Sequence, residues 1–126
     1  AARFSPEGEP TYITLYTVIN KRSGAGAHSA ILVNGSERVM FDPAGTWYHP
    51  KLPERNDVHF GMTDKALAFY IDYHTRKTYD TIEQKIYVSP EVAELALQRV
   101  GLGAGDDAGH HLDGFARVFA GGRFGR

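Results

Sequence analysis

The sequence predicts an α+β fold: a small antiparallel sheet with two helices packed on one side of it, followed by a Gly-rich C-terminal tail. The first observation is a series of runs rich in β-branched and aromatic residues, separated by small-residue turns. The second is a pair of later segments in which helical spacing of apolar residues follows a capping residue. With 126 residues, of which 42% are hydrophobic, the chain has the size and composition of one globular domain.

The first third of the chain predicts three strands. Residues 1–10 contain two prolines and are expected to form a loose leader. The Asn34-Gly35 step lies between apolar runs and predicts a hairpin turn, because both residue types tolerate positive φ. We therefore expect strands over residues 11–20, 28–33 and 37–42.

Residues 43–62 predict a long loop. Three prolines and two glycines interrupt this segment, and its apolar residues follow no sustained period. Loops of this length are uncommon inside a compact domain and often serve as lids or binding loops.

Two helices and a strand are expected next. Thr63 is a good N-cap for a helix that runs to about His74, with Leu67, Tyr70, Ile71 and His74 on one face. Alternation over residues 78–88 predicts a strand with one half-buried face made of Ile82, Ile86 and Val88. Ser89-Pro90 begins a second helix, which ends at Gly101 and has an apolar stripe formed by Val92, Leu95, Ala96 and Val100.

The composition changes after residue 100. Residues 101–126 hold more than half of the 14 glycines, and Leu112, Phe115 and Phe119 keep a helical spacing. We expect a single domain over residues 11–100 and a Gly-rich tail over 101–126 that includes at most a short helix.

Charge and cysteine content exclude several classes of protein. Fourteen basic and 15 acidic residues give a net charge of -1, which argues against a nucleic-acid partner. No apolar run is long enough to predict a transmembrane segment. The absence of cysteine excludes disulfides, thiolate metal sites and a cysteine nucleophile in this chain. The Ala-Ala start suits removal of a secretory signal among other origins, so a periplasmic or envelope location is one option.

His28 and Asp42 are the candidate catalytic residues. His28 begins an apolar strand and Asp42 ends the next, so both lie at the same end of one hairpin. A carboxylate beside an imidazole can hold one tautomer, as in a hydrolase triad. A two-residue turn would place the two side chains on opposite faces, whereas a three-residue turn over 34–36 would pair His28 with Asp42. The alternative is a histidine at a strand start and an Asp-Pro turn without chemistry.

The order of small-residue loop, His28, apolar strand, turn and strand ending in Asp42 resembles the circularly permuted NlpC/P60 branch of papain-like hydrolases. The resemblance covers about residues 11–100, and residues 41–62 are similar to the same stretch of bacterial envelope-type proteins of this kind. It implies that His28 is the base and Asp42 the orienting group of a thiol hydrolase of amide or ester bonds.

The chain departs from that family because it lacks the nucleophilic cysteine, which would be expected shortly after the second helix. We therefore expect a catalytically incomplete domain. Either the chain is a non-catalytic descendant, or a change of reading frame or a truncation has replaced the segment that carried the cysteine.

The other hypothesis is a non-enzymatic module that binds a small ligand or peptide through residues 43–62. Aromatic and polar side chains in a proline-stiffened loop can close over a ligand. A concave site under Trp47 and Phe60 is then expected; the alternative is that both rings pack on the core and pin the loop. The candidate binding residues are Trp47, His49, Asp57, His59 and Phe60.

The remaining histidines do not predict a metal site. None of their spacings matches a recognised ligand motif, and adjacent His110 and His111 diverge on a helix or strand. No metal or cofactor is expected, and the oligomeric state is left open. The residues that could contribute ligands to such a site are His49, His59, His74, Asp57, Asp72, His110, His111 and Asp113.

Overall fold

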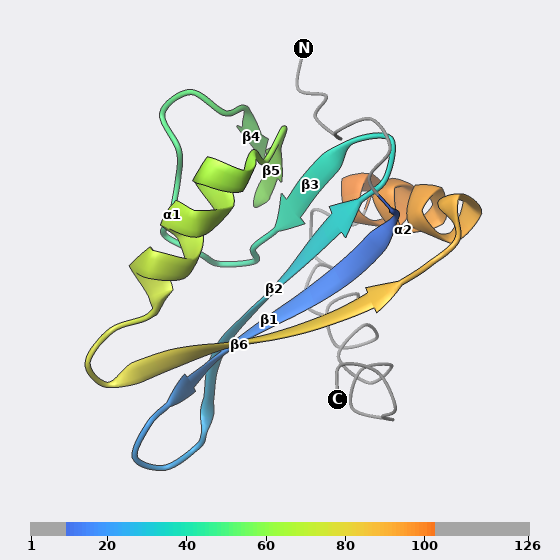
Figure 1. Ribbon diagram of the computed structural model, residues 1–126. Coiled ribbons are helices and arrows are strands. Elements are labelled where there is room, and N and C mark those ends of the chain that lie inside the picture. Colours follow the sequence, from blue (N-terminus) through green and yellow to red (C-terminus); the bar gives the residue numbers. More distant parts are fainter. Residues whose placement is uncertain (1–9, 103–126) are drawn as a thin grey trace.

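A computed structural model describes residues 10–102 as an antiparallel sheet with one helix on each face (Figure 1). The six strands lie in the order β4-β5-β3-β2-β1-β6, and every neighbouring pair is antiparallel. The α+β prediction is therefore confirmed. The elements are β1 (Tyr12–Asn20), β2 (Gly26–Asn34), β3 (Arg38–Phe41), β4 (Glu54–Arg55), β5 (Val58–Phe60), α1 (Asp64–His74), β6 (Tyr79–Tyr87) and α2 (Pro90–Leu102).

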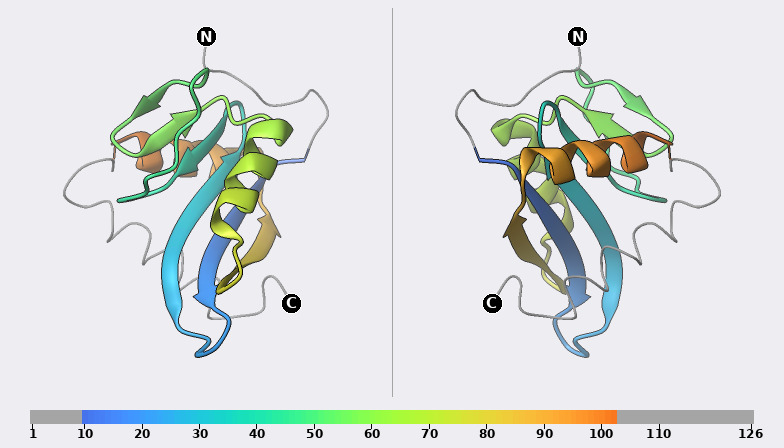
Figure 2. Two further views of the ribbon diagram at one scale, coloured as in Figure 1. Left: turned by 90° about the vertical axis from the view of Figure 1, so that its left-hand side faces the viewer. Right: turned by 90° about the vertical axis from the view of Figure 1, so that its right-hand side faces the viewer.

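The two helices lie on opposite faces of the sheet, so the expectation that they share one side is wrong (Figure 2). Side chains alternate between the faces of a strand, and both faces of β1 and β2 are apolar. Ile13 and Ile31 belong to the core under α2, whereas Tyr16 and Leu32 belong to the core under α1. Each apolar face therefore needs its own helix.

The hairpin between β2 and β3 has a register that the sequence did not predict. Asn34 pairs with Arg38, so the connection is a three-residue loop over 35–37 instead of 34–36. Ile31 pairs with Phe41, and continuing this register places Asp42 opposite Ala30. Asp42 and His28 consequently lie on the same face, two positions apart along β2.

The segment 43–62 contains a short hairpin and is not a loop throughout. β5 pairs with β3, and β4 pairs with β5. Asn56 and Asp57 connect the two strands with φ values of 50° and 65°, in the left-handed region that tight hairpins require. This hairpin fixes both ends of the loop that precedes it.

The predicted caps of both helices are confirmed. Thr63 accepts a hydrogen bond from the Ala66 amide at 3.1 Å, and the Ser89 hydroxyl accepts one from the Val92 amide at 3.2 Å.

The apolar stripe expected for α2 is partly wrong. Val92 and Leu95 are 44% and 59% exposed, whereas Ala93, Ala96 and Val100 are buried. The apolar residues of α2 form two neighbouring stripes of similar helical spacing, one through Val92 and one through Ala93. The stripe through Ala93 faces the sheet, because its small side chain lets the helix pack more closely. Ile82 of β6 is likewise more exposed than expected, at 42%.

The leader up to residue 9 and the tail from residue 103, including the short helix expected around Leu112, Phe115 and Phe119, lie outside the described residues. Neither α1 nor α2, the helices of residues 10–102, has the length and apolar character needed to cross a membrane.

Candidate functional site

The candidate site lies on the α1 face of the sheet, where β2, the segment after β3 and the last turn of α1 meet. His28 and Asp42 reach this face through the register of the β2–β3 hairpin. Tyr70 and His74 reach it from α1, because residues four apart lie on the same side of a helix.

One carboxylate oxygen of Asp42 joins strand and helix. His28 Nε2 contacts Asp42 Oδ1, and the hydroxyl of Tyr70 donates a hydrogen bond to the same oxygen at 3.0 Å. Because a carboxylate oxygen only accepts hydrogen bonds, the first contact requires Nε2 of His28 to carry its proton. His28 Nδ1 is then the nitrogen that can take a proton from another group.

Asp42 is 1% exposed, and its second oxygen, Oδ2, has no hydrogen-bond partner among residues 10–102. The backbone of Gly45 lies directly against this oxygen. The Tyr70 hydroxyl is buried beside the carboxylate, and burial, reinforced by the charge of Asp42, raises its pKa. Tyr70 therefore acts as a hydrogen-bond donor to Asp42 at neutral pH.

His74 lies next to His28. Its Nδ1 is 2.8 Å from the Tyr70 carbonyl oxygen, so Nδ1 carries the proton and donates it. The rings of His28 and His74 are 5.5 Å apart at their centroids and parallel within 5°. Burial lowers the pKa of His74, although the Tyr70 carbonyl and Asp42 oppose this shift. His74 is therefore neutral near pH 7.

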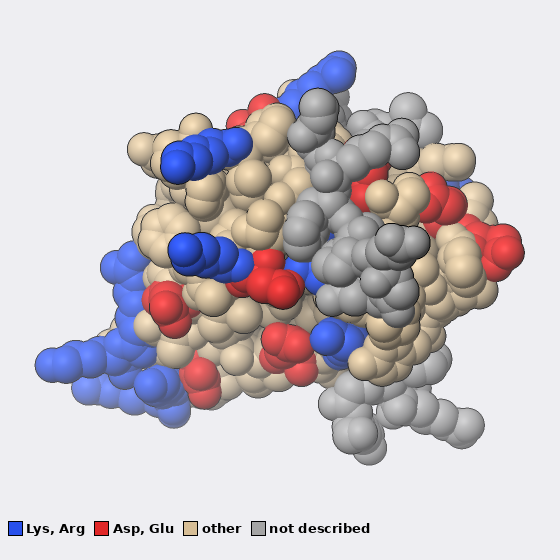
Figure 3. Space-filling model, turned by 45° about the horizontal axis from the view of Figure 1, so that its top comes forward, with Lys and Arg blue, Asp and Glu red and all other residues tan. Residues whose placement is uncertain are grey.

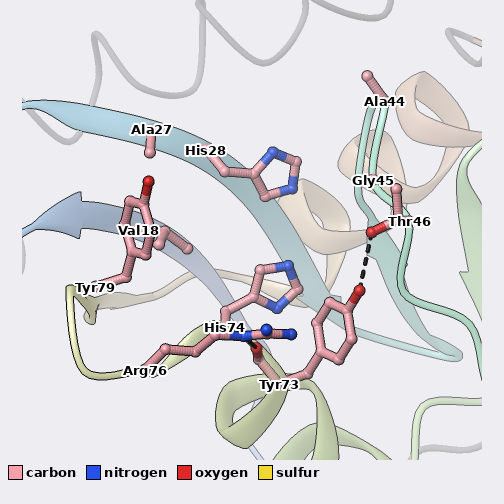
Figure 4. Close-up of a pocket in the computed structure, with 10 residues that line it drawn as sticks. All are labelled: Val18, Ala27, His28, Ala44, Gly45, Thr46, Tyr73, His74, Arg76 and Tyr79. Atoms are coloured by element: carbon pink, nitrogen blue, oxygen red, sulfur yellow. Dashed lines mark hydrogen bonds between the residues drawn. The ribbon is translucent and has the colours of Figure 1, made fainter.

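A pocket of about 310 Å³ opens beside these histidines (Figure 4). Figure 4 shows the rings of His28 and His74 between the Ala44–Thr46 segment on one side and Val18 and Tyr79 on the other. Arg76 lies at its edge, where its Nε donates to the Tyr73 carbonyl at 2.9 Å. The lining residues are Val18, Ala27, His28, Ala44, Gly45, Thr46, Tyr73, His74, Arg76 and Tyr79.

A second pocket, of about 250 Å³, adjoins the first. Thr46 and Tyr73 line both pockets, and a 3.0 Å hydrogen bond joins their hydroxyls. Trp47 is buried against Tyr70, while Tyr48 is 70% and Phe69 48% exposed. The second pocket therefore has an aromatic wall and lies one side chain away from His74.

The loop residues predicted to bind a ligand do not form one site. Trp47 contacts the rings of His49 and His59, which are 6.4 Å and 5.0 Å away. Phe60 packs on the α2 face instead, because it follows His59 by one position in β5. Trp47 and Phe60 consequently do not share a concave site.

Asp57 and His59 contact the loop and the core instead of lining a pocket with the other predicted residues. The Asp57 carboxylate accepts a hydrogen bond from the Ala44 amide at 3.2 Å and so tethers the loop. His59 is 3% exposed, and burial lowers its pKa. Its Nδ1 has no hydrogen-bond partner within the described part of the chain.

The sequence did not single out Tyr70, Tyr73, His74 and Arg76 as one group beside His28. Helical spacing placed Tyr70 and His74 on the apolar face of α1. A polar ring on an apolar helix face is the sequence feature that could have marked both residues as candidates for the site. Which strand end they face depends on how α1 packs, and no local pattern encodes that.

Acidic and basic side chains are interspersed over the face shown in Figure 3, and Lys and Arg side chains gather at one corner of it. No protein-family model, curated protein or solved structure matches the chain.

Proposed function

We propose that this chain is a catalytically incomplete papain-like domain of the NlpC/P60 type, which binds an amide- or ester-containing ligand beside His28 without cleaving it. The observation that supports this proposal is the shared oxygen of Asp42, which orients His28 while Tyr70 holds the carboxylate. An orienting carboxylate on one imidazole nitrogen leaves the other nitrogen to act as a base.

The position of the pair supports the same function. His28 lines a 310 Å³ pocket, so a ligand can reach its ring, whereas the carboxylate is buried behind it. A base at a pocket wall with its orienting group in the interior is the arrangement that nucleophilic catalysis requires. The missing component is the thiol, since the chain has no cysteine.

A single introduced cysteine tests this proposal. Thr46→Cys places a thiol on the wall of the pocket that His28 lines, and Thr78→Cys places one at an exposed control position. Because imidazole favours the reactive thiolate, iodoacetamide should alkylate the Thr46→Cys variant about tenfold faster than the control at about pH 6.5.

The second variant of this experiment removes the base. Adding His28→Gln to Thr46→Cys keeps an N–H donor for Asp42 but no group that can take a proton, so the rate should fall to that of the control. Equal rates for the two single-cysteine variants, in proteins with unchanged melting temperatures, would overturn the proposal.

A ligand-binding module is the second candidate, and the continuity of the two pockets favours it. Segment 44–50 lines both pockets and provides aromatic surface at Trp47 and Tyr48. A blocked dipeptide amide distinguishes the candidates. Binding beside His28 should shift the imidazole resonances of His28, whereas binding at the aromatic wall should shift the indole resonance of Trp47, the single tryptophan.

A further inference from the structure

Three side chains with metal-binding atoms converge on the α1 face of the sheet. One ligand atom from each of His28, Asp42 and His74 lies within 4.8 Å of the other two. These residues come from β2, the position after β3 and the end of α1, so no spacing in the sequence identifies them as a group. None of the three is exposed.

The two imidazoles have the orientation that a shared ion requires. Figure 4 shows a nitrogen of each ring facing the other. In His74 this nitrogen is Nε2, since Nδ1 is bonded to the Tyr70 carbonyl. The lone pair of an imidazole nitrogen lies in the plane of its ring, and the two planes differ by only 5°. Both lone pairs can therefore point to one position.

The carboxylate provides an independent observation. Asp42 Oδ2 is buried without a hydrogen-bond partner among the described residues, and Asp42 as a whole is 1% exposed. A buried acceptor left without a partner destabilises the folded protein. A cation held by this carboxylate would compensate for that loss.

Tyr70 supports two of the three side chains at once. Its hydroxyl donates to Asp42 Oδ1, and its carbonyl accepts from His74 Nδ1. Metal-binding histidines commonly donate their second nitrogen to a carbonyl or carboxylate, which fixes the tautomer and the direction of the ligating nitrogen. Tyr70 thus occupies the place of an outer-sphere residue.

We propose that His28, Asp42 and His74 form a binding site for a divalent transition-metal ion such as Zn²⁺. Two imidazole nitrogens and one carboxylate oxygen match the ligand preference of Zn²⁺, which binds both atom types at about 2.0–2.2 Å. The 310 Å³ pocket, which His28 and His74 both line, leaves the remaining coordination position open to water or a ligand. This proposal is independent of the proposed function.

Metal binding displaces one proton. Nε2 of His28 gives up the proton that it shares with Asp42 Oδ1, this proton passes to solvent, and Nε2 and a carboxylate oxygen of Asp42 then bind the ion. The ion would occupy the nitrogen that Asp42 otherwise orients.

Calorimetric titration of the full chain with Zn²⁺, after removal of metal with a chelator, tests the site. His74→Asn is the most informative variant, because the asparagine amide can still donate to the Tyr70 carbonyl while Nε2 is lost. We expect one equivalent of Zn²⁺ to bind the wild type, with an affinity about 100-fold lower in His74→Asn and about tenfold lower in Tyr70→Phe.

Matched controls separate this site from the other histidines. His49→Ala and the double variant His110→Ala/His111→Ala should bind Zn²⁺ at the same high-affinity site as the wild type. The visible spectrum of the Co²⁺ form should show the intense bands of four-coordinate nitrogen and oxygen ligation, and His74→Asn should lack them. Unchanged binding in folded His74→Asn, loss of binding in the His110/His111 variant, or no binding to the wild type would each overturn the proposal.

Discussion

The carboxylate of Asp42 lies against the backbone of Gly45, so closely that a Cβ atom at position 45 would overlap Asp42 Oδ2. The Gly45 amide also donates to the Asp42 carbonyl at 3.2 Å, which closes the turn after β3. Glycine at position 45 is therefore required by the space that the carboxylate occupies, while the carboxylate is held by His28 and Tyr70.

Gly45→Ala is expected to displace Asp42 and to lower the free energy of unfolding by about 1–3 kcal/mol, the usual cost of overpacking a tight site. Nitrogen-15 spectra of the His28 ring should show that the Nε2–H tautomer is no longer fixed. Gly26→Ala is the matched control, since a Cβ there meets nothing within 4 Å. Equal effects of the two substitutions in urea denaturation would contradict the close approach of Gly45 to Asp42.

Tyr70→Phe removes the donor to Asp42 Oδ1 and keeps the ring. Since both groups are buried, we expect a loss of about 1–2 kcal/mol in the free energy of unfolding. Tyr48→Phe removes a hydroxyl from a residue that is 70% exposed, and its effect should stay within about 0.5 kcal/mol. Chemical denaturation of the three proteins measures both values, and a neutral Tyr70→Phe substitution would contradict the role assigned to this hydroxyl.

Stability is expected to fall as the pH is lowered from neutrality. Burial lowers the pKa of His59 and His74 in the folded protein below the ordinary value of 6.5. Between these folded values and 6.5 the unfolded chain binds more protons than the folded one, so acid favours unfolding. The contribution of these two histidines to the free energy of unfolding is complete above pH 6.5 and is lost as the pH falls toward their folded pKa values.

Urea denaturation between pH 7.5 and 5 measures this slope. His59→Gln removes one of the two histidines whose pKa burial lowers and should flatten the dependence. An unaltered slope in His59→Gln would show that His59 does not contribute to the pH dependence.

Thr63→Ala is expected to destabilise the protein by about 1 kcal/mol, because the Ala66 amide loses its capping acceptor. Thr63→Ser keeps the hydroxyl and should retain most of the stability. Thermal denaturation of both variants checks the cap; similar losses in the two would indicate that the threonine methyl group matters more than the hydrogen bond.

The sequence was most informative where a single segment carries the whole signal. Thr63 and Ser89 marked the beginnings of both helices because an N-cap is a local interaction within four residues. The β-branched and aromatic run over residues 11–20 predicted β1 for the same reason. The β4–β5 hairpin was missed because two short strands around Asn56 and Asp57 carry too weak a pattern.

The hairpin register shows how far local patterns extend. Asn34-Gly35 predicted a turn at the correct place, but the loop over 35–37 is displaced by one position from the three-residue alternative considered. Displacing a three-residue loop by one position shifts the pairing by two residues, so Asp42 stays on the face of His28 but lies opposite Ala30; a two-residue turn would have placed Asp42 on the other face. The contact between His28 and Asp42 therefore depends on the pairing of two strands, which their separate sequences do not specify.

The sequence by itself determined the class of fold, the caps of the helices and the presence of a histidine and an aspartate at one end of a hairpin. Only the tertiary structure decided that α1 and α2 cover opposite faces, and that Tyr70 and His74 therefore face His28 and Asp42. The physical reason is that caps and strand propensities are set by near neighbours, whereas the site is formed by side chains that packing brings together from three separate elements.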